Sequence, residues 1–140
     1  MFRKAIYLLL VSVLAVIGVA HAAERCTPEE AKALVEEAVS YLNEHGKDQA
    51  LAEFNKPESM FVKDDLYVFV LDTKGMMVAH PKNPTLIGEN LLEEESQEKA
   101  LQGSGWLNYV HQNPTTKMEE SKTTYFQRVG DLVVLCGAYQ

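Results

Sequence analysis

Apolar residues first recur along the chain with the period of a helix. Starting at Ala31, they return three, four, seven, eight and eleven positions later, which puts them on one face of a helix. The preceding Thr27-Pro28-Glu29-Glu30 supplies a capping residue, a proline suited to the first helical position and a capping-box glutamate. Gly46 is typical of a helix end. The pattern predicts one long amphipathic helix between Thr27 and Gly46, followed by a shorter helix that ends before Pro57.

From Leu66 onward the period becomes that of strands. Runs rich in β-branched and aromatic residues predict five strands, at residues 67–71, 76–80, 106–111, 122–129 and 132–139. Asp72-Thr73-Lys74-Gly75 is expected to join the first two as a hairpin, because Gly75 adopts the positive φ that such a turn needs. The acidic segment 91–101 is expected to form a helix that Gly103 ends. Five mostly antiparallel strands with helices packed on one side make an α+β fold.

The first 22 residues are expected to lie outside this fold. A short basic start, an apolar stretch from Ala5 to Ala20 and the small residues of Ala20-His21-Ala22 are typical of a cleaved signal peptide. The alternative is an uncleaved membrane anchor, because 16 apolar residues come close to the length of a membrane span. We therefore expect an exported, periplasmic protein with a signal peptide at residues 1–22 and a single domain at residues 23–140.

Charge and cysteine content narrow the classes of partner. Without Arg3 and Lys4 the chain carries 11 basic and 20 acidic residues, a net charge of −9, so nucleic acid is not an expected partner. The two cysteines, Cys26 and Cys136, are candidates for one disulfide in an oxidising compartment, or else remain two free thiols. Their spacing fits no haem-attachment or CxxC metal pattern.

One histidine ends a predicted strand and stands directly before a proline. Pro81 biases His80 toward an extended backbone at the point where the chain leaves the sheet. The imidazole of His80 either donates a hydrogen bond to a bound carboxylate or caps the loop backbone without seeing a ligand. The residues alone leave both interpretations open. His111 is expected to be exposed.

The sequence offers no recognisable catalytic arrangement. It contains no GxSxG, HExxH, P-loop or GxGxxG motif. The acidic run Glu93-Glu94-Glu95 is interpreted as a solvated helix face, because consecutive helical residues point in different directions. We therefore expect neither catalysis nor a cofactor nor a metal site.

Several segments taken together resemble the single Cache domains, the extracytoplasmic members of the PAS-like sensor group. They are the capped helix, "YVFVLDTKGMMVAHPKNPTLIGENLL" from Tyr67, and "GSGWLNYVHQNPTTKMEESKTTYFQRVGDLVVLCGAYQ" from Gly103. The resemblance implies a PAS-like five-stranded antiparallel sheet, with the long N-terminal helix packed on one face and a small-molecule pocket on the other. It also implies a ligand that is a small organic acid, an amino acid or an amine.

The ligand-binding residues are expected among the aromatic and polar side chains of the strands. Trp106 and Tyr109 differ in parity along one strand, and Lys122 and Tyr125 do so along another, so strand alternation favours one residue of each pair as structural. The full set of candidates is Tyr67, Phe69, His80, Trp106, Tyr109, Lys122 and Tyr125.

The resemblance implies a sensory or binding module that signals through a partner, such as a membrane-bound receptor or kinase. The alternative is an interaction or structural protein of the cell envelope that has the same fold and no ligand. The short segment between "NLL" and "GW" favours this alternative, because family members usually carry a longer helix there, over the pocket. In family members the N-terminal helix can pair with that of a second copy to form a homodimer, and the acidic outer face of this helix leaves that pairing open here.

Overall fold

The computed structural model describes residues 25–140, and the expected signal peptide lies outside these residues. Two helices come first, α1 at Pro28–His45 and α2 at Lys47–Phe54. They are followed by β1 at Val62–Lys63, β2 at Leu66–Asp72, β3 at Met77–Ala79, a 3-10 turn η1 at Pro84–Leu86, and α3 at Glu94–Leu101. The chain ends with β4 at Ser104–Gln112, β5 at Glu119–Val129 and β6 at Leu132–Tyr139. In this part of the chain no helix is both long and apolar enough to span a bilayer.

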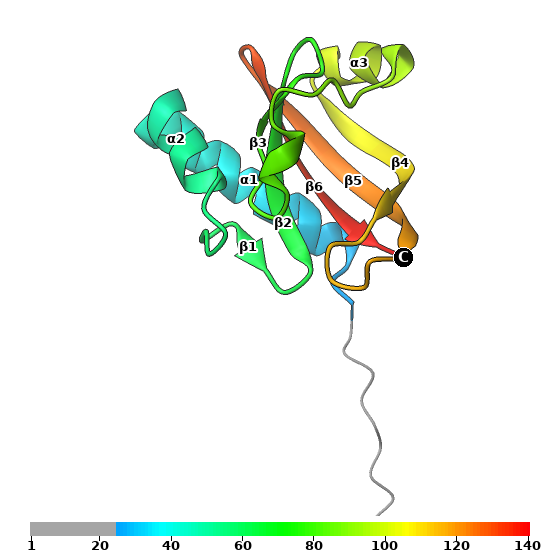
Figure 1. Cartoon of the computed structure of the whole chain (residues 1–140). Helices are drawn as coiled ribbons and strands as arrows, with labels where there is room; N and C mark the ends of the chain where they lie inside the picture. The colour runs from blue at the N-terminus through cyan, green and yellow to red at the C-terminus, as the bar shows by residue number, and fades with distance from the viewer. Residues whose placement is uncertain (1–24) are drawn as a thin grey trace, which may run out of the picture.

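The strands form one antiparallel sheet in the order β1-β2-β6-β5-β4, and β3 also pairs with β2. The five predicted strands are confirmed. β1 is an addition to them, because a pair of residues is too short to show a period. α1 packs behind β2, β5 and β6 (Figure 1). The α+β, PAS-like fold with the N-terminal helix on one face is therefore confirmed.

The predicted start of α1 is confirmed in detail. The Thr27 side chain accepts a hydrogen bond from the Glu30 backbone N–H at 3.2 Å, and the Glu30 carboxylate accepts one from the Thr27 N–H at 2.7 Å. The apolar face of the helix is buried, as its spacing predicts. Gly75 closes the β2–β3 hairpin with φ of +87°, as its turn demands.

The predicted helix at 91–101 begins later than expected, at Glu94. The residues before it are held by the β2–β3 hairpin instead. Asn90 bridges Met76, and the Leu91 N–H donates to the Gly75 carbonyl at 3.1 Å. Long-range hydrogen bonding has therefore overridden the helical tendency of this stretch.

Strand alternation divides the buried residues between two cores. Val68, Val70 and Cys136 face α1, whereas Tyr67 and Phe69 face the opposite side of the sheet. The second face is covered by the segment between β3 and β4, which includes α3. A cavity remains on this face.

The candidate disulfide is not formed in the structure, where both cysteines are free. Cys136 is buried on β6, and Cys26 precedes α1 and packs at the margin of the same core. Burial raises the pKa of the Cys26 thiol to about 11 and that of the Cys136 thiol to about 12. Both side chains are therefore protonated thiols at neutral pH.

Candidate functional site

The cavity lies on the face of the sheet that α1 does not cover, and its volume is about 340 Å³. This volume is at the lower end of the range for small-molecule sites. One end is polar, with His80, Tyr109 and Lys122. The other end is mostly apolar, with Leu71, Met77 and Leu92, and Glu93 and Ser96 also line the cavity. A small molecule with at least one polar group fits such a lining.

Lys122 is the central feature of the cavity. It is only 1% exposed, and its ammonium group donates to the Tyr67 hydroxyl at 3.1 Å. The same nitrogen lies over three aromatic rings, 4.4 Å from the centroid of Tyr67 and 4.9 Å from those of Phe69 and Tyr139. Such cation–π contacts favour the charged form of the lysine.

Burial lowers the pKa of Lys122 to about 8, which leaves the side chain mostly protonated at pH 7. Among residues 25–140, no carboxylate lies within ion-pair distance of this ammonium. A buried cation without an anionic partner is costly. An anion in the cavity would supply the missing charge.

Gly137 makes room for this lysine. A Cβ atom at this position would lie 2.5 Å from Cε and 2.7 Å from Cγ of Lys122, and 2.2 Å from Oγ1 of Thr124. These separations are far below van der Waals contact. The lysine therefore lies flat over the β6 backbone only because residue 137 has no side chain.

His80 has one of its two possible roles, capping the loop backbone, and its geometry leaves the ligand-binding role open. It is 3% exposed, and its Nδ1 accepts hydrogen bonds from the backbone N–H groups of Lys82 at 3.1 Å and Asn83 at 2.8 Å. Because those donors occupy Nδ1, the neutral ring carries its proton on Nε2. Among the described residues Nε2 has no hydrogen-bond partner, and the ring lines the cavity. His80 thus caps the loop and retains one donor for a ligand.

Burial lowers the pKa of His80 to about 3, and the positive charge of Lys122 and the nearby His111 act in the same direction. The ring also packs against the Tyr67 ring, with centroids 5.0 Å apart. His80 is therefore a neutral donor at physiological pH, and the ammonium of Lys122 is the charged group at this end of the cavity.

The tyrosines around the lysine form hydrogen-bonded pairs. The hydroxyls of Tyr67 and Tyr139 are 3.0 Å apart, and the Tyr109 hydroxyl accepts from Thr124 Oγ1 at 3.1 Å. Burial raises the pKa of Tyr67 and of Tyr109, so both stay protonated. The phenolic proton of Tyr109 remains available to a ligand.

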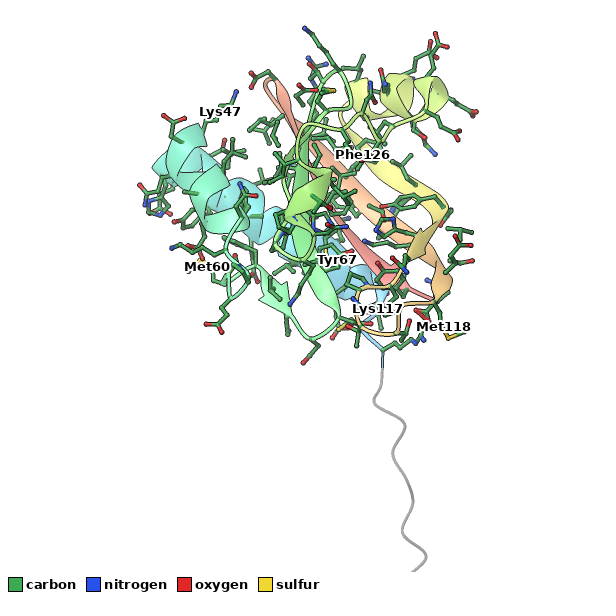
Figure 2. All side chains as sticks on the ribbon, in the orientation of Figure 1. Lys47, Met60, Tyr67, Lys117, Met118 and Phe126 are labelled. Atoms are coloured by element: carbon green, nitrogen blue, oxygen red, sulfur yellow. The ribbon has the colours of Figure 1, made fainter. Side chains whose placement is uncertain are left out.

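The structure brings together five of the seven predicted residues. Phe69, His80, Tyr109 and Lys122 line the cavity, and Tyr67 lies beside them as the hydrogen-bond partner of Lys122. Figure 2 shows Tyr67 near the middle of the packed side chains. That these residues bind a ligand remains a prediction.

Trp106 and Tyr125 lie on the other face of the sheet, toward α1, and are therefore not part of this site. They pair across β4 and β5 with ring centroids 5.2 Å apart. Trp106 and Tyr125 have the opposite parity to Tyr109 and Lys122 along their strands, so their side chains point to the opposite face of the sheet. The regular β4–β5 register contains no bulge that would bring them back.

Two further residues belong to the site. Tyr139 was a polar candidate to which the sequence assigned no role; it reaches Lys122 because it pairs with it across β5 and β6, and that register is not visible in the sequence. His111 is half-buried in the cavity wall rather than exposed, and burial lowers its pKa. Its parity with Tyr109 along β4 was the only available signal. Within residues 25–140, no cluster of three His, Cys, Asp or Glu side chains could hold a metal ion.

Comparisons with known proteins agree with this fold. A family model described as Cache domain matches residues 36–139. The structure of a methyl-accepting chemotaxis protein from Vibrio parahaemolyticus is similar, with a TM-score of 0.65, 22% identity, and coverage of 79% of this chain and 86% of that one. A Cache chemosensory domain described for its recognition of carboxylic acids gives a TM-score of 0.67 at 22% identity, covering 79% and 91% of the two chains.

A periplasmic sensor domain of a chemotaxis protein gives a TM-score of 0.54 at 24% identity, covering 79% of this chain and 88% of that one. At these identities the similarity to the solved structures establishes a common fold. No curated protein matches the chain significantly.

Proposed function

The chain belongs to the Cache domain family, and from this premise we propose that it is an extracytoplasmic sensory module that binds a small carboxylate beside Lys122. One observation carries the proposal. The Lys122 ammonium is 1% exposed, and within residues 25–140 it has no anionic partner. A bound carboxylate would neutralise it.

The neighbouring groups suit the same ligand. His80 offers its Nε2 proton and Tyr109 its phenolic proton, so three donors face the polar end of the cavity. A carboxylate has two oxygens that together accept several hydrogen bonds. An amine at this end of the cavity would bring a second positive charge close to Lys122, which opposes its binding there.

The ligand-free alternative has less support from the cavity. A structural protein with this fold would gain nothing from a buried, unpaired lysine, because a buried charge destabilises a protein unless it is compensated. The short segment between β3 and β4 still covers the face, since Leu86 and Leu92 line the cavity from it. The segment that covers the cavity is therefore short but present.

We further propose that the protein is exported to the periplasm and that a membrane-bound receptor or kinase reads the occupancy of the cavity. Sensor domains of chemotaxis proteins share this fold. The proposed cleavage after Ala22 is tested by the mass of the purified mature protein.

The test is thermal unfolding of the purified protein against a panel of small acids, amino acids and amines. A carboxylate at a hundredfold its dissociation constant adds about 2.7 kcal/mol to the free energy of unfolding, a rise of several degrees. Lys122→Met should abolish the response, whereas Lys74→Met, the same change at an exposed site, should keep it. A panel without any response would favour the ligand-free alternative.

A further inference from the structure

β4 forms one outer edge of the sheet, and this edge lacks the usual protection against pairing with another strand. The strand is nine residues long, Ser104–Gln112, and its register with β5 is continuous. It contains no Lys, Arg, Asp, Glu or Pro. Natural edge strands are commonly guarded by charges, prolines, bulges or short length. None of these devices is present on β4.

The backbone groups that face outward can be identified from the ends of the β4–β5 ladder. The Arg128 N–H donates to the Gly103 carbonyl at 2.6 Å, and the Asn113 N–H donates to the Met118 carbonyl at 2.9 Å. Hydrogen-bonded pairs alternate along an antiparallel ladder, so the odd-numbered residues between 103 and 113 bond to β5. The even-numbered residues therefore turn their N–H and C=O groups to the open edge: Ser104, Trp106, Asn108, Val110 and Gln112.

Almost all of these outward groups are free within residues 25–140. The exception is the Gln112 carbonyl, which accepts a hydrogen bond from the Tyr139 hydroxyl at 3.4 Å and so turns toward the interior rather than to the open edge. Of the same residues, Trp106 packs partly against the core on the α1 side of the sheet. Asn108 and Val110 border the cavity, and Val110 is 63% exposed.

We propose that two copies of the chain pair through β4, antiparallel and in register about Asn108. Asn108 is the midpoint of Ser104–Gln112, so a two-fold axis through it pairs the strand with itself. Trp106 then lies opposite Val110 of the partner, and Ser104 lies opposite Gln112. This register places apolar residues opposite apolar ones and polar residues opposite polar ones, which favours it over neighbouring registers of the two strands.

Along this strand charge does not oppose a second copy, although elsewhere it does. Without Arg3 and Lys4 the chain carries a net charge of −9, so two copies repel each other over most of their surface. Along β4 no charge opposes their approach, and the outward face of α1 carries Lys32, Glu36, Glu37 and Glu44 instead. This makes β4 a better self-association surface than the N-terminal helix, through which family members can pair.

The geometry leaves room for the helices. Across the joined edges, β5 of one copy and β5 of the other are three strand spacings apart, about 14 Å. A helix with its side chains is about 10–12 Å wide, so two helices centred over β5 and β6 do not collide. The two sheets would form one continuous sheet with both α1 helices on the same face.

The test compares two substitutions at the two-fold axis by sedimentation velocity over a range of concentrations. Asn108→Pro removes the outward N–H that bonds across the axis but no bond to β5, so we expect a folded monomer with association weakened at least about tenfold. Asn108→Ala keeps the N–H and should dimerise like the wild type. A wild-type monomer at all concentrations, or a dimer that Asn108→Pro leaves intact, would overturn the proposal.

Cross-linking tests the register independently, in a Cys26→Ser background. Two residues that form a hydrogen-bonded pair between antiparallel strands have Cα atoms about 5.5 Å apart, a separation that a disulfide can bridge. The Asn108→Cys variant should therefore form a disulfide between residue 108 of one copy and residue 108 of the other. Ser104→Cys should not, because the two copies of residue 104 would be eight positions apart in register, about 27 Å. Efficient self-linking of Ser104→Cys would contradict the register and with it the proposal.

Discussion

The lowered pKa of the buried His80 makes the free energy of unfolding depend on pH. In the folded protein the pKa of His80 is lowered to about 3 by burial, whereas an unfolded histidine titrates near 6.5. Between about pH 3 and pH 6.5 the histidine is protonated in the unfolded chain but neutral in the folded protein. The free energy of unfolding therefore rises with pH over this range and no longer depends on His80 above it. At pH 5 the expected loss from this residue is about 2 kcal/mol, from about 1.5 pH units at 1.36 kcal/mol each.

The perturbation that isolates this effect is His80→Asn. The amide oxygen of asparagine can accept the two loop N–H groups that now bond to Nδ1, but it does not titrate. The ring contacts with Tyr67 and Phe69 are lost, so we expect the variant to be less stable at pH 8 by about 1–3 kcal/mol. It should nevertheless lose about 2 kcal/mol less than the wild type between pH 8 and pH 5.

The assay is urea unfolding of both proteins at pH 8, 6.5 and 5, with the difference between their pH profiles as the measured quantity. Carboxylates that titrate elsewhere contribute equally to both profiles and cancel. His111 and Lys122, which face the same cavity, are present in both proteins. Parallel profiles would refute the reasoning, as would an NMR titration that places the pKa of His80 near 6.5 in the folded state.

Three further outcomes follow from the same geometry. Gly137→Ala pushes a Cβ atom into Lys122 and Thr124, so we expect a loss of about 1–3 kcal/mol in thermal unfolding and a much weaker response to carboxylates. If a carboxylate binds the protonated Lys122, whose pKa is about 8, the dissociation constant should rise about tenfold from pH 7 to pH 9, and a flat calorimetric profile would contradict this role. Thr27→Ala removes the capping box of α1 and should cost about 1 kcal/mol in urea unfolding; an unchanged midpoint would mean that the cap contributes little.

The local elements of this fold were readable because their signals lie within a few residues. The apolar spacing from Ala31 and the Thr27–Glu30 capping box specify α1, and the turn chemistry of Asp72–Gly75 specifies the β2–β3 hairpin. Where long-range bonds compete, the sequence misleads. The stretch before Glu94 has helical character but is held in extended form by the hairpin.

The site was only partly predictable for a related reason. Alternation along a strand indicates that Trp106 and Tyr109 face opposite sides, but not which side carries the cavity. Lys122, by composition alone, is a typical surface residue. Its burial depends on Tyr67 and Tyr139, which reach it from two other strands.

The sequence by itself determined α1, the β2–β3 hairpin and the alternation of side chains along each strand, since these follow from periods of 3.6 and 2 and from local caps and turns. Only the tertiary structure decided what surrounds Lys122 and which partner each nitrogen of His80 has. Those contacts join residues far apart along the chain through the register of β2, β5 and β6. A shift of one residue in that register would turn every side chain of a strand to the other face, and local sequence does not fix it.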